Sequence, residues 1–247
     1  MAQQDVWEKE YRDKKLVGGD KPAASFRAFV KYLKKEYRRE RRENGEPDSD
    51  GFVFQNMNIL DLGSGEGKNA LYCAERGAQV IGVEIARNAV ETADLSAQKK
   101  DREIRVAKGT LRYELGSIGE KFDIQTNSQD IVLDVTSSNS LNEAERVIYL
   151  DEVERVLKPG GYFFVRALCK DGDENAKNLV RDFPGGEGEK DTYTMPDLGL
   201  TERVFTESDF RETYARFNII KLKKEFHYTR FGDRSYKRAF WIAYLQR

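Results

Sequence analysis

Short, continuously apolar segments alternate with amphipathic stretches between positions 57 and 168. At their clearest the apolar segments read MNILDL, QVIGVE, DIVLDV and YFFVRAL, and apolar residues recur every three or four positions in the stretches between them. Uninterrupted apolar runs are typical of strands that are buried on both faces, whereas the longer spacing is that of a helix. This alternation favours a parallel sheet with helices on both faces.

The pattern predicts the bounds of each element. Strands are expected at Met57–Leu62, Gln79–Glu84, Ile104–Lys108, Asp130–Val135 and Tyr162–Leu168. The helices between them are expected at Lys68–Arg76, Ala86–Lys100 and Asn142–Leu157. Asn142 is followed three residues later by Glu145, which is the pattern of a capping box. We therefore expect the last of these helices to begin at Asn142.

The flanking segments differ from this core. A helix is expected at Ala23–Arg42, and the segment Cys169–Thr201 is rich in glycine and proline, which indicates an insertion. Farther along, the pattern predicts a helix at Thr206–Phe217 and two strands at Ile219–Tyr228 and Tyr236–Leu245. The short turn between those two strands predicts that they pair in antiparallel fashion.

The sequence as a whole therefore predicts one doubly wound α/β domain. We expect a seven-stranded, mostly parallel sheet that is closed by antiparallel C-terminal strands. Its expected parts are a helical N-terminal cap at 1–50, a ligand-binding core at 51–168, an inserted lid or substrate segment at 169–205, and a C-terminal helix with two strands at 206–247.

Charge and cysteine content limit the partners and the cellular compartment that the sequence predicts. The chain has 42 basic and 43 acidic residues, so it has no overall field that would attract nucleic acid or a membrane surface. Cys73 and Cys169 are too far apart to indicate a disulfide framework or a metal site. No apolar run approaches the ~20 residues of a membrane helix, and the first residues hold no apolar signal core. We expect a cytoplasmic protein that neither binds a metal nor inserts into a membrane.

A glycine-rich turn follows the first predicted strand. Positions 58–70 read NILDLGSGEGKNA, so that Gly63, Gly65 and Gly67 precede a helix. Glycine permits a sharp turn and lets a ligand approach the backbone, and the helix N-terminus favours an anionic group. The spacing G-x-G-x-G differs from the G-x-G-x-x-G of dinucleotide-binding proteins, and Asp61 stands two residues before the first glycine.

This turn resembles the first motif, D-x-G-x-G-x-G, of the class I S-adenosylmethionine-dependent methyltransferases. Glu84 at the end of the second predicted strand and the LKPGG segment Leu157–Gly161 are also similar to that family. The resemblance covers roughly positions 58–168, and the stretch GKNALYCAERGAQV is similar to the tellurite-resistance and thiopurine-type enzymes. It implies an EC 2.1.1 enzyme with a Rossmann-like fold and S-adenosyl-L-methionine as cofactor. The leading interpretation is methyl transfer to a small-molecule acceptor.

The resemblance also implies which residues contact the cofactor. Asp61 and the backbone of the glycine-rich turn would hold its methionine end, and Glu84 would bind the ribose diol. The turn at Gly109 would bracket the adenine, and the end of the fourth strand would face the transferable methyl group. The implied cofactor-binding residues are Asp61, Gly63, Ser64, Gly65, Asn69, Glu84, Ile85, Gly109, Thr110, Leu111, Asp134 and Val135.

Four residues are candidates for the acceptor pocket, and each also has a purely structural interpretation. Tyr11 closes over the cofactor as part of a lid, or it only packs the N-terminal helices. Asn139 lines a pocket or only forms a turn. Arg166 binds an anionic substrate or forms a surface ion pair, and His227, the single histidine, acts as a base or is structural. We name no catalytic residue, because an activated methyl group mainly requires alignment and exclusion of water.

Three further functions stay open from the sequence. A methyltransferase for RNA or protein would use the basic stretch Lys31–Arg42, although Glu36 and Glu40 interrupt it and predict ion pairs along a solvated helix face. The residues DVTS at 134–137 include no proline, which argues against methylation of exocyclic amines in nucleic acids.

The second open function is a non-catalytic S-adenosylmethionine-binding module. The third is a nicotinamide oxidoreductase, which the glycine spacing disfavours. The acceptor atom and the oligomeric state are left undetermined.

Overall fold

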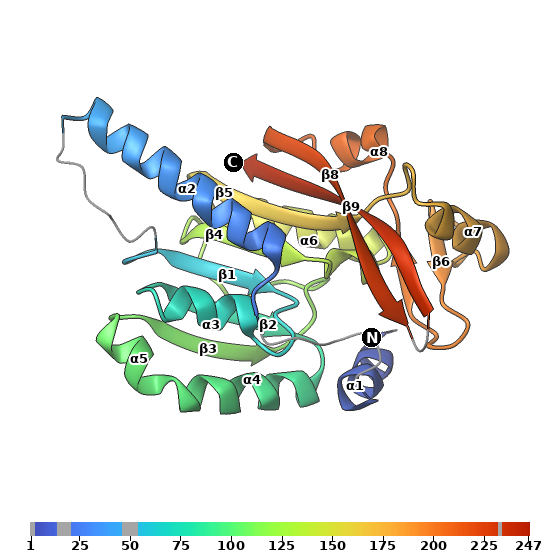
Figure 1. Ribbon diagram of the computed structural model, residues 1–247, viewed down its shortest axis with the longest axis horizontal. Coiled ribbons are helices and arrows are strands. Elements are labelled where there is room, and N and C mark those ends of the chain that lie inside the picture. Colours follow the sequence, from blue (N-terminus) through green and yellow to red (C-terminus); the bar gives the residue numbers. More distant parts are fainter. Residues whose placement is uncertain (1–2, 14–20, 46–53, 232–233) are drawn as a thin grey trace.

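A seven-stranded sheet organises the molecule (Figure 1). The computed structural model describes residues 3–13, 21–45, 54–231 and 234–247. The strands, in their order across the sheet, are β3 (Thr110–Leu115), β2 (Gln79–Glu84), β1 (Asn58–Leu62), β4 (Gln129–Val135), β5 (Leu157–Leu168), β9 (Arg234–Gln246) and β8 (Asn218–Phe231). Neighbours among β1 to β5 pair in parallel, and β9 is antiparallel to both β5 and β8, which confirms the predicted fold class.

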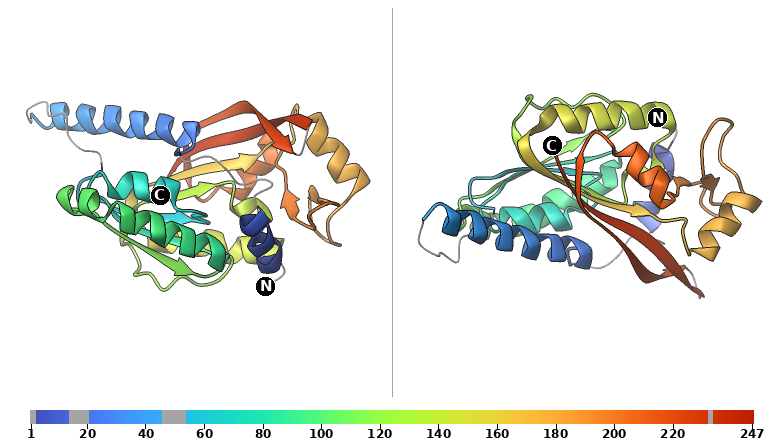
Figure 2. Two further views of the ribbon diagram at one scale, coloured as in Figure 1. Left: turned by 60° about the horizontal axis from the view of Figure 1, so that its bottom comes forward. Right: turned by 90° about the horizontal axis from the view of Figure 1, so that it is seen from above.

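Helices cover both faces of this sheet (Figures 1 and 2). The covering helices are α2 (Ala24–Glu43), α3 (Lys68–Ala74), α4 (Arg87–Lys99), α6 (Glu143–Val156) and α8 (Glu207–Thr213). Side chains of α2 and α3 form the core of one face, and those of α6 and α8 form the core of the other. The apolar strands are therefore buried on both sides, as their composition predicts.

Helix α2 packs on the sheet through aromatic side chains. Phe29 stacks on Phe164 of β5 with ring centres 5.0 Å apart. Burying a side chain of this size contributes about 2–3 kcal/mol, so the apolar stripe holds the helix in place. On its solvent side Arg39 pairs with Glu36 at 2.6 Å and with Glu43 at 3.6 Å, which confirms the predicted ion pairs. In the part of the chain that the structure describes, no helix is both long and apolar enough to cross a bilayer.

The N-terminus of α6 confirms the predicted capping box. The side-chain oxygen of Asn142 accepts a hydrogen bond from the N–H of Glu145 at 2.8 Å. The carboxylate of Glu145 in turn accepts the N–H of Asn142 at 3.0 Å. Each bond satisfies a backbone donor that the end of a helix otherwise leaves unpaired. The cap therefore fixes where α6 begins.

The third strand lies later in the chain than the sequence predicts. Residues 101–106 form the helix α5 (Asp101–Val106), and β3 begins only at Thr110. β3 reads TLRYEL, an alternating pattern, because it is the partly exposed edge strand of the sheet. A continuous apolar run is the signature of an inner strand. That rule misplaced the strand at Ile104–Lys108, where Ile104 is the one buried residue of α5.

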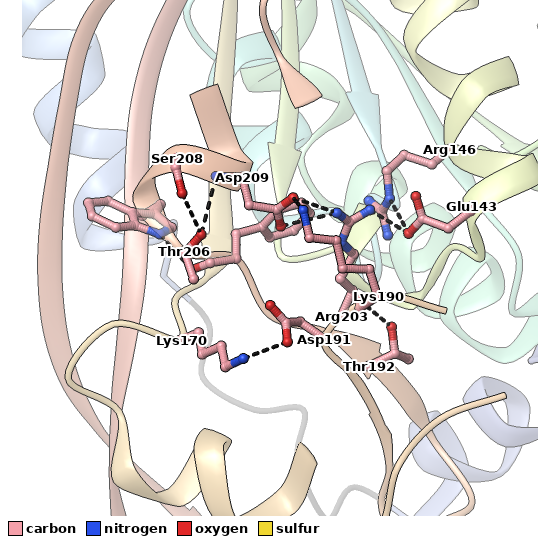
Figure 3. Close-up of polar contacts among 12 residues, drawn as sticks. Glu143, Arg146, Lys170, Lys190, Asp191, Thr192, Arg203, Thr206, Ser208 and Asp209 are labelled. Atoms are coloured by element: carbon pink, nitrogen blue, oxygen red, sulfur yellow. Dashed lines mark hydrogen bonds and ion pairs between the residues drawn. The ribbon is translucent and has the colours of Figure 1, made fainter. Parts of the chain in front are cut away.

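The insertion after β5 carries secondary structure of its own. It contains α7 (Glu174–Asp182), β6 (Thr192–Thr194) and β7 (Thr201–Arg203), and the two short strands pair in antiparallel fashion. Figure 3 shows how its end is anchored. Arg203 donates two hydrogen bonds of 3.0 Å to Asp209 of α8 and also pairs with Glu143 of α6. These contacts attach the insertion to both helices that cover one face of the sheet.

Candidate functional site

The turn between β1 and α3 adopts a backbone conformation that favours glycine. Gly63, Gly65 and Gly67 have φ angles of 65°, 55° and 79°, all in the left-handed region. The turn also approaches the loop after β4 closely, since a Cβ on Gly63 would lie 2.3 Å from the Cβ of Ser137. Conformation and packing therefore both require the glycines of this motif.

Asp61 places an unpaired carboxylate oxygen beside this turn. The residue lies on β1 and is 1% exposed, and its Oδ2 has no hydrogen-bond partner among the described residues. Burial raises the pKa of Asp61 to about 7, and the charges of Asp134 and Glu84 act in the same direction. A buried carboxylate of this kind is stabilised by a cation, so Asp61 is suited to accept an ammonium group.

Glu84 ends β2 and ties that strand to the glycine-rich turn. One carboxylate oxygen accepts the N–H of Gly65 at 2.8 Å, and the other accepts the N–H of Ala86 at 2.9 Å. Burial raises the pKa of Glu84 in spite of these hydrogen bonds. The N–H of Ser64 donates to the carbonyl of Val83 at 3.0 Å. The N–H groups of Ser64 and Gly65 thus already have acceptors within the protein, and the contact of this backbone with the methionine end of the cofactor stays a prediction.

A cleft of about 180 Å³ opens at the carboxyl ends of β1 to β4. Among the predicted cofactor contacts, Gly63, Glu84, Ile85 and Val135 line it. Open α/β sheets bind their ligands at this edge, where the connections on either side of a strand diverge. The cleft therefore lies where the fold favours a binding site, and it is lined by Gly63, two residues after Asp61.

The predicted contacts at Gly109, Thr110 and Leu111 lie at the opposite edge of the sheet. Thr110 pairs with Gln79, the first residue of β2, so this turn precedes β3 instead of following it. The turn that follows β3 is 116–118, and its residues line the cleft. The error follows from the misplaced third strand. The signal for the correct turn is the glycine and serine directly after TLRYEL.

Asp134 and Asn69 have structural partners that the resemblance did not foresee. The carboxylate of Asp134 accepts the N–H of Ser137 at 2.9 Å and the hydroxyl of Tyr149 at 2.6 Å, and the residue is fully buried. It shapes the loop after β4 and does not face the cleft. The side-chain oxygen of Asn69 accepts the N–H of Ala23 at 3.3 Å and so fixes the chain just before α2.

Helix α1 (Gln4–Asp13) borders the cleft and contributes two aromatic side chains to it. Trp7 and Tyr11 both line the cleft, and a Cβ on Gly65 would come within 2.6 Å of the Tyr11 hydroxyl. Burial raises the pKa of Tyr11, and the charge of Glu84 adds to this effect. Tyr11 therefore faces the glycine-rich turn, as the lid interpretation of the N-terminal segment requires.

Two side chains hold α1 in this position. The amide of Gln3 donates to the carbonyls of Ser140 at 2.6 Å and Thr201 at 2.9 Å, and it accepts the N–H of Thr201 at 2.8 Å. The carboxylate of Glu8 accepts the N–H of Arg87 at 2.7 Å and thereby caps α4, which has no side-chain cap of its own. Neither role is predictable from the sequence, because the partners of both residues lie at least 79 positions away.

The other three acceptor candidates do not line this cleft. Asn139 is buried, and its side-chain oxygen accepts the N–H of Leu168 at 3.1 Å, which is a structural contact. Arg166 and His227 both lie against Phe240: the guanidinium carbon of Arg166 is 3.6 Å from the centre of that ring, and the ring of His227 is 5.9 Å from it. The fold thus brings together two candidates that are far apart in sequence.

Comparison with known protein sequences is consistent with this geometry. Residues 60–165 match a family model described as a methyltransferase domain. A "Ubiquinone biosynthesis O-methyltransferase" of Bartonella quintana is 32% identical over 184 residues, which is 69% of this chain and 74% of that protein. Proteins of the same name from Bartonella tribocorum and Cereibacter sphaeroides match over only 42% and 49% of their lengths. The chain therefore spans less than half of those two relatives.

Solved structures share the fold at low sequence identity. TehB from Haemophilus influenzae superimposes with a TM-score of 0.58 and 17% identity, over 79% of this chain and 59% of that one. The 1,6-didemethyltoxoflavin-N1-methyltransferase of Burkholderia thailandensis, with bound 1,6-didemethyltoxoflavin and S-adenosylhomocysteine, gives a TM-score of 0.65 and 17% identity, over 100% of this chain and 87% of that one. At these identities the similarity establishes the fold alone.

Proposed function

Because this chain belongs to the class I S-adenosylmethionine-dependent methyltransferases, we propose that it transfers a methyl group from S-adenosylmethionine to an oxygen atom of a small molecule. The sequence relatives are named O-methyltransferases, which favours oxygen as the acceptor atom, and the Burkholderia structure, which is named an N1-methyltransferase, contains 1,6-didemethyltoxoflavin and S-adenosylhomocysteine, which favours a small molecule as the acceptor. The observation that carries the proposal is the pair of buried carboxylates, Asp61 and Glu84, beside a glycine-rich turn at the carboxyl edge of the sheet.

The residues of the cleft fit this cofactor. The unpaired Oδ2 of Asp61 suits its ammonium group, and Glu84 has lone pairs left for the ribose hydroxyls. Ile85 and the turn 116–118, both of which line the cleft, provide surfaces for the adenine ring. When bound, the cofactor supplies a methyl group that its sulfonium has already activated.

The protein's part in the transfer is mainly to align the acceptor and to exclude water. Val135 and Leu141 are apolar residues of the cleft, and Trp7 of α1 borders it. The hydrogen bonds of Gln3 and Glu8 hold α1 against the rest of the site. We therefore assign α1 the role of a cover that keeps water away from the reacting atoms.

Two measurements on the full-length protein test this function. Calorimetry is expected to show saturable binding of both S-adenosylmethionine and S-adenosylhomocysteine. Incubation with methyl-labelled cofactor and a fractionated cell extract is expected to place the label in the small-molecule fraction. The absence of binding heat with either ligand contradicts the proposal. Label that appears only in RNA or protein favours a macromolecular substrate instead, and binding without any transfer favours a non-catalytic module.

A further inference from the structure

The carboxyl half of β5 holds a cation, Arg166, that has no counter-ion among the described residues. The guanidinium of Arg166 is half-buried, and within the described residues it forms no hydrogen bond and no ion pair. Its contact is the face of Phe240, 3.6 Å from the guanidinium carbon. Burial lowers the pKa of Arg166 to about 10, which still leaves the group charged at neutral pH.

Two arginines that are more deeply buried than Arg166 are paired within the fold. Arg203 donates two hydrogen bonds of 3.0 Å to Asp209. Arg238, which lies on the strand next to Arg166, donates to Asp173 at 3.2 Å. Removing a guanidinium from water is costly unless it is paired. Because the N–H donors of Arg166 have no acceptor among the described residues, they are available to a bound ligand.

Arg166 lies on the strand next to the residues of β4 that line the cleft. It is the register partner of Val135, which lines the cleft, and the N–H of Thr136 donates to the carbonyl of Arg166 at 2.7 Å. Paired residues of neighbouring strands project from the same face of a sheet, about 4.8 Å apart. Phe240 belongs to β9, one strand farther on. The guanidinium is therefore roughly one to two strand spacings, about 5–10 Å, beyond the end of β4.

The local charges favour a ligand with a single negative charge. Among the described residues, the acidic side chain whose charge acts on Arg166 is Glu225, and it already pairs with Lys223 and His227. Arg238, the other cation whose field reaches Arg166, is neutralised by Asp173. One uncompensated positive charge matches one carboxylate, which a guanidinium binds through two parallel hydrogen bonds. A phosphate dianion would need a second cation.

From this arrangement we propose that Arg166 binds the carboxylate of the small-molecule methyl acceptor, an inference that rests on the proposed function. The donor side of the site then holds the cofactor through Asp61 and Glu84, and Arg166 orients the acceptor from the other side of Val135. The spacing requires an acceptor whose carboxylate is separated from the methylated atom by roughly the width of an aromatic ring.

The test uses benzoate, benzamide and inorganic phosphate as probes. Each is titrated by calorimetry into the full-length protein saturated with S-adenosylhomocysteine, for the wild type and for Arg166→Gln. A matched control is Lys224→Gln, because Lys224 also stacks on an aromatic ring, 5.1 Å from the centre of Trp241, but that ring belongs to the core of the opposite face of the sheet. Both variants remove one positive charge.

We expect the wild type and Lys224→Gln to bind benzoate and to discriminate against benzamide. In Arg166→Gln we expect benzoate affinity to fall about tenfold or more, as for loss of a charge-assisted hydrogen bond, with binding of S-adenosylhomocysteine unchanged. A wild type without preference for benzoate, equal losses in the two variants, or tighter binding of phosphate overturns the inference. Failure of S-adenosylhomocysteine to bind is a separate result, which contradicts the proposed function itself.

Discussion

The carboxyl edge of the sheet is acidic on one side and basic on the other. At β1 and β2, the buried carboxylates of Asp61 and Glu84 form no ion pair within the described residues. At β5, the guanidinium of Arg166 likewise has no counter-ion among the described residues. By contrast, Arg203 and Asp209, which are as deeply buried as the two carboxylates, neutralise each other. Under the functions proposed above, uncompensated charge, rather than charge as such, therefore marks the positions that would bind a ligand.

The sign of the uncompensated charge distinguishes the two sides. Besides its carboxylate, S-adenosylmethionine carries a positive ammonium and a positive sulfonium, and its net positive charge suits the acidic side. The basic side suits an acceptor with a negative group. Both sides meet at Val135, whose strand lies between β1 and β5. Substitutions on each side, followed by measurement of stability and of ligand affinity, distinguish the charges that stabilise the fold from those proposed to bind a ligand.

The largest effect is expected from a paired arginine. Arg238→Met leaves Asp173 buried without its partner, so we expect the free energy of unfolding to fall by about 3–5 kcal/mol. Arg166→Met leaves no carboxylate unpaired, and we expect it to cost less than about 1 kcal/mol. Urea unfolding of both variants measures the difference. A loss for Arg166→Met as large as that for Arg238→Met would show that Arg166 is structural.

On the acidic side, Asp61→Asn is expected to change the pH dependence of stability. The pKa of Asp61 is about 7 in the folded protein against 3.8 for an aspartate in water, so folding favours its protonated form. The free energy of unfolding of the unliganded protein therefore falls as the pH rises from 3.8 to about 7, by on the order of 4 kcal/mol from this group. Asp61→Asn should remove this contribution. Denaturant titrations across that range measure it, and an unchanged slope contradicts the expectation.

A smaller effect is expected on binding of the cofactor. Glu84→Ala should weaken the affinity for S-adenosylmethionine by about 1–3 kcal/mol, because charge-assisted hydrogen bonds to the ribose are lost. Calorimetry measures the change. Glu114→Ala serves as the control, since that carboxylate lies on the edge strand β3 and pairs with Arg112. If the two variants bind alike, Glu84 has no role in the site.

The smallest effect concerns the attachment of α1. Glu8→Ala removes the cap of α4, and we expect it to lower the free energy of unfolding by about 1 kcal/mol. The same variant should release S-adenosylhomocysteine faster, because the cover over the cleft is less firmly held. Stopped-flow measurement of the dissociation rate tests this, with the exposed residue Asp5 of the same helix changed to Ala as the control. Equal dissociation rates in the two variants would show that the attachment of α1 does not help to retain the cofactor.

The sequence predicts this fold correctly where the structure depends on local pattern. The inner strands were found because a strand buried on both faces must be apolar throughout. The capping box at Asn142 was found because both of its partners lie within one turn of helix. The edge strand β3 was misplaced because its partial exposure weakens the apolar signal, and the contacts assigned to Gly109, Thr110 and Leu111 were wrong for that reason. The side chain of Asp134 was expected to face the transferable methyl group, but it points into the core. Its partner there, Tyr149, is brought to it only by the packing of the folded chain.

The amino-acid sequence alone was enough to establish the family and the chemistry of the turn from Asp61 to Gly67, since a strand, a tight turn and a helix are encoded in one continuous segment. Folding decided that the residues after β3 line the cleft, that Gln3 and Glu8 hold α1 beside it, and that Arg166 is left without a counter-ion among the described residues. Each of these depends on which distant residues meet. Such pairing is a property of the folded chain, because a charge is compensated or exposed only by what packs around it.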